Sequence, residues 1–73
     1  MAEHPSELKK LTAIAGDLEI PSILRIQAIE VLGNAGTHEA LLALLELAGK
    51  EKLIAEERDL ALKLAREIIM SGH

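Results

Sequence analysis

Histidines are the first side chains in this sequence to consider for chemistry, because imidazole is a common metal ligand. The chain has three, His4, His38 and His73, and they lie near expected helix starts or in the C-terminal tail. A helical metal site needs at least two ligands at a spacing such as i, i+4. No two histidines have that spacing, so we expect no metal site.

Carboxylates are the second candidates, since Glu56, Glu57 and Asp59 stand close together. Acidic residues at a helix start are favoured by the helix dipole, and no nucleophile, base and oxyanion donor can be grouped around them. Gly33 and Gly36 follow an expected helix rather than a strand, which excludes a dinucleotide-binding loop. The sequence therefore predicts no enzyme activity, no cofactor and no small-molecule substrate.

Two arginines, Arg25 and Arg58, are 33 residues apart. They are candidates for a rim that recognises an acidic protein partner. The alternative is hydrogen bonding or ion pairing within the fold, for example of Arg58 with Glu57, Glu19 or Glu30. We favour the structural role, because planar guanidinium groups suit such bridges.

The spacing of the arginines belongs to a repeat that covers most of the chain. Shifting the sequence by 33 residues aligns Leu8 with Leu41, Leu11 with Leu44, Ala15 with Ala48, Gly16 with Gly49, Arg25 with Arg58 and Ala28 with Ala61. A period of this length is typical of helical solenoids, in which each unit buries its apolar face on the next. We therefore expect one domain over residues 1–73, with units at about 5–36 and 37–70.

Composition narrows the function classes further. The 73 residues carry a net charge of −4 and contain no cysteine and no aromatic residue. Disulfides, thiolate metal sites and base-stacking platforms are therefore excluded, and a phosphate-binding surface is disfavoured. The longest apolar run, residues 40–45, is far shorter than the ~20 residues of a membrane span. No secretion signal is present at the N-terminus, so we expect a cytoplasmic protein.

Hydrophobic periodicity predicts four helices over about residues 5–16, 21–36, 37–49 and 54–70, and no strand. Pro5 and Pro21 suit first helical positions, and Thr37 suits an N-cap. The fold class is all-α, with four antiparallel helices arranged as two stacked hairpins. We expect the core to comprise Leu8, Leu11, Ala15, Leu18, Leu24, Ala28, Val31, Leu32, Ala35, Leu41, Leu42, Leu44, Leu45, Leu47, Ala48, Leu60, Ala61, Leu64 and Ile68.

Several apolar residues fall outside these stripes. A second stripe on the last helix contains Leu62, Ala65 and Ile69, so its two stripes span roughly 200° of the helix. Clustered apolar surface of this kind is typical of protein interfaces. The predicted interface residues are Ile23, Ile26, Leu62, Ile69, Met70, Arg25 and Arg58.

The second expected helix and the turn after it resemble a known repeat. Residues 25–36 follow the pattern Arg-x-x-Ala-x-x-x-Leu-Gly-x-x-Gly, which resembles the HEAT-like units of the bilin-lyase type. Arg58, Ala61 and Ala65 are similar to the start of a second copy. The resemblance spans about residues 8–70 and implies stacked antiparallel helix pairs, with a binding surface along the second and fourth helices.

This sequence departs from the HEAT pattern at two places. HEAT units usually carry an Asp six residues before the Arg, where this chain has Glu19 and Lys52. The second copy also replaces the Leu-Gly step with Ala65 and Arg66. The last helix therefore resembles either the end of an array or a helix adapted to pack on something else.

The sequence leaves several functions open. We favour a non-enzymatic protein-interaction or scaffold module, whose partner is another protein or a second copy of this chain. The alternatives are a designed or excised solenoid piece without activity of its own, and a regulatory or lyase-associated subunit. A helix-turn-helix DNA binder is opposed by the acidic charge and by an apolar third helix where basic residues are needed.

Overall fold

The computed structural model describes residues 5–71, and these residues form four α-helices without any strand. Helix α1 spans Pro5–Ala15, α2 Ser22–Ala35, α3 His38–Ala48 and α4 Ala55–Met70. The all-α class and the number of helices are confirmed. Each helix boundary lies within a residue or two of the expected one.

The ends of the helices follow from local residue types. Thr37 caps α3, because its hydroxyl accepts a hydrogen bond from the amide of Ala40 at 3.1 Å. Gly36 ends α2 in the left-handed conformation, with φ of 66°. Pro21 is the N-cap residue of α2 rather than its first helical residue. Gly33 does not stop α2, which continues through it to Ala35.

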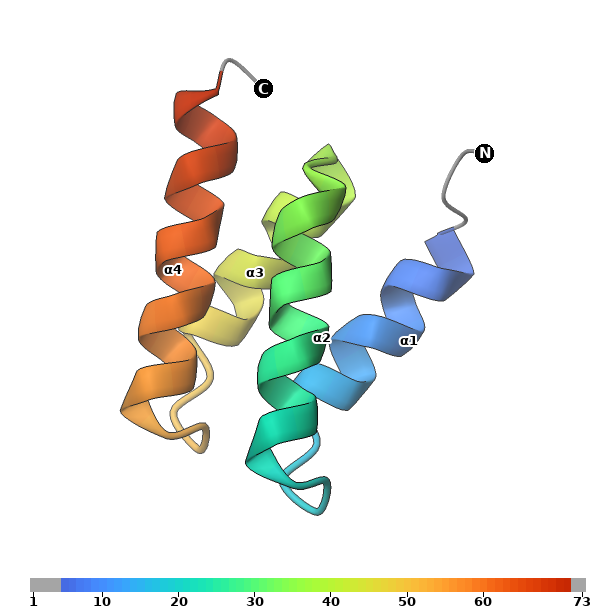
Figure 1. Cartoon of the computed structure of the whole chain (residues 1–73), viewed down its shortest axis with the longest axis vertical. Helices are drawn as coiled ribbons and strands as arrows, with labels where there is room; N and C mark the ends of the chain where they lie inside the picture. Colours follow the sequence, from blue (N-terminus) through green and yellow to red (C-terminus); the bar gives the residue numbers. More distant parts are fainter. Residues whose placement is uncertain (1–4, 72–73) are drawn as a thin grey trace.

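The helices pack as two sequential pairs, α1 against α2 and α3 against α4 (Figure 1). Helix α2 also packs against α3 and α4, and α1 packs against α3. Within residues 5–71, α1 and α4 do not contact each other. The colours of Figure 1 show that α2 and α4 run side by side in the same direction. Helix α2 therefore separates the first helix from the last.

Small and branched aliphatic side chains fill the core between these helices. Ala15, Ile29, Leu32, Ala40, Leu44, Ala61 and Ala65 are fully buried. Alanines recur where the helices meet, because a small side chain lets two helices approach closely. The core is therefore built from alanines at close helix contacts together with leucine and isoleucine side chains.

The expected core differs from the observed one on one face of α2. Leu24 and Val31 were expected to be buried, but they are 46% and 48% exposed, whereas Ile29 is fully buried. The helix is rotated so that Arg25, Ile29 and Leu32 face its neighbours. Leu18, Leu42 and Leu45 are also exposed, contrary to expectation.

Helices α2 and α4 approach each other closely at Gly33. A Cβ atom placed on Gly33 would lie 2.8 Å from Cδ1 and 3.1 Å from Cβ of Leu64. The absence of a side chain at Gly33 therefore allows α2 and α4 to approach closely at this point. Leu64 fills the space that any side chain at position 33 would need.

No helix within residues 5–71 combines the length and apolar character that crossing a bilayer requires.

Candidate functional site

A buried ion pair joins α2 to α4. Nε of Arg25 donates to Oε1 of Glu57 at 2.9 Å, and Nη2 donates to Oε2 at 3.0 Å. The hydroxyl of Ser22 also donates to Oε2 of Glu57. Glu57 is fully buried and Arg25 is 7% exposed. Two parallel N–H···O bonds fix the angle between the groups as well as their distance, so the pair sets how α4 sits on α2.

The remaining side of the guanidinium anchors the connection between α1 and α2. Nη1 of Arg25 lies 3.4 Å from the carbonyl oxygens of Asp17 and Leu18 and donates to the carbonyl of Ile20. One side chain therefore ties the α1–α2 connection, α2 and α4 together. Arg25 thereby supplies a donor to three carbonyl groups of a connection that has no regular secondary structure.

The pair perturbs the pKa of both groups. Burial raises the pKa of Glu57, but hydrogen bonds from Arg25 and Ser22 and the charge of Arg25 outweigh burial, so the pKa lies below its ordinary value. The hydrogen bond to Glu57 raises the pKa of Arg25 against the opposing effect of desolvation, and the charges of Glu57 and Asp17 raise it further. Both side chains are therefore ionised near neutral pH.

Arg58, which follows Arg25 by 33 residues, has a different environment. Its side chain is half-buried, and its Nε is buried without a hydrogen-bond partner among the described residues. The ion pair that the sequence suggested for Arg58 with Glu57 is wrong, because Arg25 takes that carboxylate. The structural role is confirmed for Arg25 only.

Among the described residues, no helix packs against one side of α4. Arg58, Leu62, Arg66 and Ile69 recur at helical spacing on this side, and we call them the outer stripe of α4. Leu62 is 45% exposed and Ile69 54% exposed. The outer stripe thus combines two exposed apolar side chains with two arginines.

A groove at the opposite end of the helix stack, between α1 and α2, exposes a second apolar surface. It has a volume of about 440 Å³ and is open to solvent. We call it the α1–α2 groove. Its lining includes Leu11, Ile14, Ile20, Leu24 and Val31, and Glu19 is its only charged side chain.

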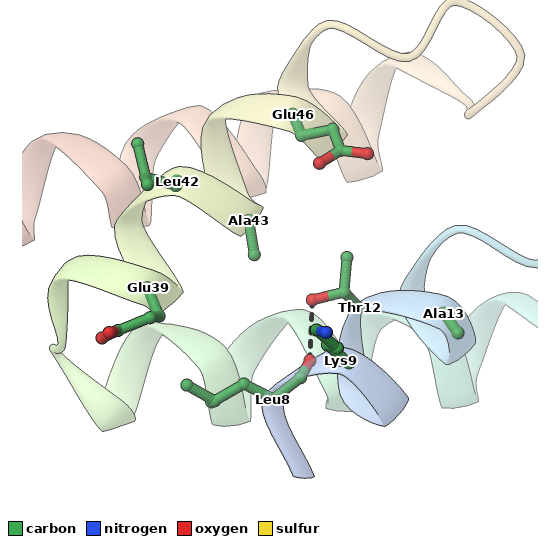
Figure 2. Close-up of a pocket in the computed structure, with 8 residues that line it drawn as sticks. All are labelled: Leu8, Lys9, Thr12, Ala13, Glu39, Leu42, Ala43 and Glu46. Carbon is green, nitrogen blue, oxygen red and sulfur yellow. Dashed lines mark hydrogen bonds between the residues drawn. The ribbon is translucent and has the colours of Figure 1, made fainter. Parts of the chain in front are cut away.

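A third surface is the groove between α1 and α3, with a volume of about 460 Å³. Figure 2 shows Leu8 and Thr12 on α1 facing the segment of α3 that carries Leu42 and Ala43. The Thr12 hydroxyl donates to the carbonyl of Leu8 at 2.8 Å and is thereby occupied within its own helix. Lys9, Glu39 and Glu46 lie at its edges, so this groove has a charged rim.

The predicted interface residues do not form one patch. Leu62 and Ile69 share the outer stripe of α4, and Met70 is exposed at the end of the same helix. Ile23 is exposed at the start of α2, whereas Ile26 is half-buried. Arg25 is buried inside the domain, so no partner can reach its guanidinium.

The acidic and histidine side chains considered for catalysis or metal binding do not converge on one site. Glu57 is held by Arg25, while Glu56 and Asp59 are exposed, so the acidic group does not converge. Residues 5–71 contain no group of three or more metal-ligating side chains. His38 is the first residue of α3, and His4 and His73 lie outside the described residues.

Sequence reasoning missed Ser22 and assigned Glu57 to the wrong arginine. The signal that could have identified the pair is the repeat itself. Glu57 directly precedes Arg58, and the equivalent position before Arg25 carries Leu24. Only one of the two arginines is preceded by a glutamate. This break in the repeat indicates that Glu57 contacts a residue earlier in the chain.

Comparison with protein-family models, with curated proteins and with solved structures found no match.

Proposed function

We propose that this chain is a non-enzymatic protein-interaction module that offers apolar helical surfaces to another protein. The observation that carries the proposal is the outer stripe of α4, where Leu62 and Ile69 remain exposed on a helix that buries its other side. Fully burying an exposed side chain of this size contributes about 1.5–3 kcal/mol, and about half of each of these two remains to be covered, so covering both would contribute roughly one full side chain. The arginines beside them would orient the partner through hydrogen bonds of fixed geometry.

The α1–α2 groove supports the same function from the other end of the domain. Leu24 and Val31 lie about half exposed there, although the apolar pattern of α2 is that of a helix that buries them. Exposed apolar side chains are ordinary when single, but a grouped set marks a contact surface. The domain therefore offers one apolar surface at each end.

We also propose that the four helices are two units of a HEAT-like solenoid. The supporting observations are the 33-residue repeat, the packing of α1 with α2 and of α3 with α4, and the separation of α1 from α4. In a solenoid each unit contacts only its neighbours, and terminal units keep an apolar face unless a cap covers it. This arrangement is consistent with the exposed apolar side chains on the outer side of each unit, Leu24 and Val31 on α2 and Leu62 and Ile69 on α4.

A comparison of surface variants tests the function. The chain and its Leu62→Glu and Ile69→Glu variants are immobilised and exposed to cell extract, and their masses are measured by analytical ultracentrifugation over a range of concentrations. We expect the unmodified chain to retain a protein other than itself and both variants to lose that contact. Asn34→Glu is the matched control, because it adds the same charge at an exposed polar position on α2.

Two results would contradict the proposed function. One is a monomer at every concentration that retains no protein. The other is a contact that all four chains make equally, because such a contact would not use the outer stripe of α4.

A further inference from the structure

The structure contains an internal example of how a helix stripe like the outer stripe of α4 is covered. The equivalent positions, 33 residues earlier, are Arg25, Ile29 and Gly33 on α2 and Gly36 directly after it. Arg25 pairs with Glu57, and Gly33 lies against Leu64, so α4 is the helix that covers this side of α2. The outer stripe of α4 repeats this side, and no helix of residues 5–71 packs over it, although Arg58 at its start is half-buried.

Arg58 indicates what is missing there. Its counterpart Arg25 has Nε bonded to a carboxylate oxygen, whereas Nε of Arg58 is buried without an acceptor within residues 5–71. A buried guanidinium N–H without an acceptor is unfavourable, and a carboxylate satisfies it best. The repeat places that carboxylate on a helix packed beside α4, at the position that Glu57 takes beside α2.

We propose that the outer stripe of α4 binds a helical hairpin of a partner protein, whose second helix carries a glutamate that pairs with Arg58. The inference rests on the proposed function and names the chemistry of the partner. Leu62, at the position of the buried Ile29, is covered by the same helix. The partner helix runs beside α4 as α4 runs beside α2 (Figure 1).

Arg66 adds a second requirement on the partner. It stands at the position of Gly33, where a Cβ atom would lie 2.8 Å from Leu64. A partner helix with a leucine at that level would collide with the Arg66 side chain. The partner therefore has its glutamate at the level of Arg58 and, seven residues later, a small side chain such as alanine where α4 has Leu64.

A second copy of this chain does not meet these requirements. If its first unit stacked on α4, the positions of Glu57 and Leu64 would be taken by Leu24 and Val31. Leucine cannot accept the Arg58 hydrogen bond, and valine is not small. The outer stripe of α4 therefore selects a partner other than this chain.

The same comparison supplies a probe made from the whole chain. The variant Leu24→Glu, Val31→Ala places the required glutamate and small side chain on its own first unit. Both positions are about half exposed, so the changes leave the core intact. A third change, Arg58→Gln, prevents the probe from binding to itself. The matched control probe carries Leu24→Gln in place of Leu24→Glu, and circular dichroism verifies that both probes are helical.

Titration of each probe into the unmodified chain, followed by isothermal calorimetry and ultracentrifugation, tests the proposal. We expect a one-to-one complex with the glutamate probe, roughly tenfold to a hundredfold tighter than with the glutamine probe. Arg58→Gln in the unmodified chain should remove the difference between the probes.

Equal affinity for the two probes, no binding of either, or a preference that survives Arg58→Gln would overturn the proposal. None of these outcomes touches the proposed function, because the Leu62→Glu and Ile69→Glu comparison does not depend on a glutamate in the partner.

Discussion

The carboxylate of Glu57 lies against the guanidinium of Arg25, 32 residues earlier in the chain, with N–O distances of 2.9 and 3.0 Å. This bidentate contact connects α2 to α4 through the domain interior. An aliphatic pair would pack there without fixing the axial position of α4 on α2, whereas two directed hydrogen bonds fix it. Arg25 is therefore the residue that sets how α4 packs on α2.

Glu57→Ala should destabilise the domain strongly. It leaves the Arg25 guanidinium buried without its partner, and breaking a buried pair in this way is among the most costly single changes. We expect the thermal midpoint to fall by roughly 10 °C or more, measured by circular dichroism. Glu56→Ala, which removes an exposed carboxylate one position earlier, is the control and should have a much smaller effect.

Replacing both partners separates the cost of an unpaired charge from the value of the pair. We expect Arg25→Met with Glu57→Leu to recover most of the stability lost in Glu57→Ala, because apolar side chains of similar volume can replace a buried pair. A double variant as unstable as Glu57→Ala would mean that the hydrogen bonds of Arg25 to the α1–α2 connection carry the stability instead.

Acid should weaken the domain through Glu57. The pKa of Glu57 is lowered by folding, so its contribution to stability is fully present above the unfolded value of about 4.3 and is lost as pH falls through the folded pKa. The raised pKa of Arg25 affects the stability of the domain only in strongly alkaline solution. We expect the midpoint difference between the unmodified chain and Glu57→Gln to be constant near neutral pH and to shrink below about pH 4.3. A difference that grows in acid would contradict this assignment.

The sequence predicted the elements better than it predicted which side of α2 is buried. Thr37 and Gly36 carry local signals that act within one turn, so the ends of α2 and α3 could be read directly. The buried side of α2 could not, because Arg25 is polar and drops out of an apolar pattern although it marks the side that faces α4. Leu18 was misplaced for another reason: α1 ends at Ala15, so helical spacing no longer applies to it.

The candidate site was predictable from the sequence only in part. Leu62 and Ile69 were recognised as surplus because α4 carries two apolar stripes, and a helix with neighbours on one side can bury only one of them. The unpaired Nε of Arg58 could not be found from sequence, since Glu57 is its immediate neighbour in the chain. The packing of α2 on α4 shows that Arg25 takes this carboxylate.

Gly33→Ala should destabilise the domain although alanine favours a helix. The gain in helix propensity is about 1 kcal/mol, but the new Cβ atom would lie 2.8 Å from Cδ1 and 3.1 Å from Cβ of Leu64. Cβ of Leu64 cannot move without its backbone, so α2 and α4 must separate. We expect a lower midpoint in chemical denaturation. Adding Leu64→Ala removes the contact with Cδ1 but keeps the contact with Cβ, so it should relieve only part of the cost of Gly33→Ala. A stabilised single variant would contradict the close approach.

Leu44→Glu places a negative charge in the core, and Ile69→Glu places the same charge at the surface. Leu44 is fully buried in α3, so a carboxylate there loses its hydration without gaining a partner, and we expect the helical circular dichroism to be lost. Ile69 is 54% exposed, and a glutamate there should change the free energy of unfolding by only about 0.5 kcal/mol. Ile69→Glu should therefore melt like the unmodified chain while losing the contact made by the outer stripe of α4. If both variants lost structure equally, Ile69 would belong to the core, and the outer stripe could not be a binding surface.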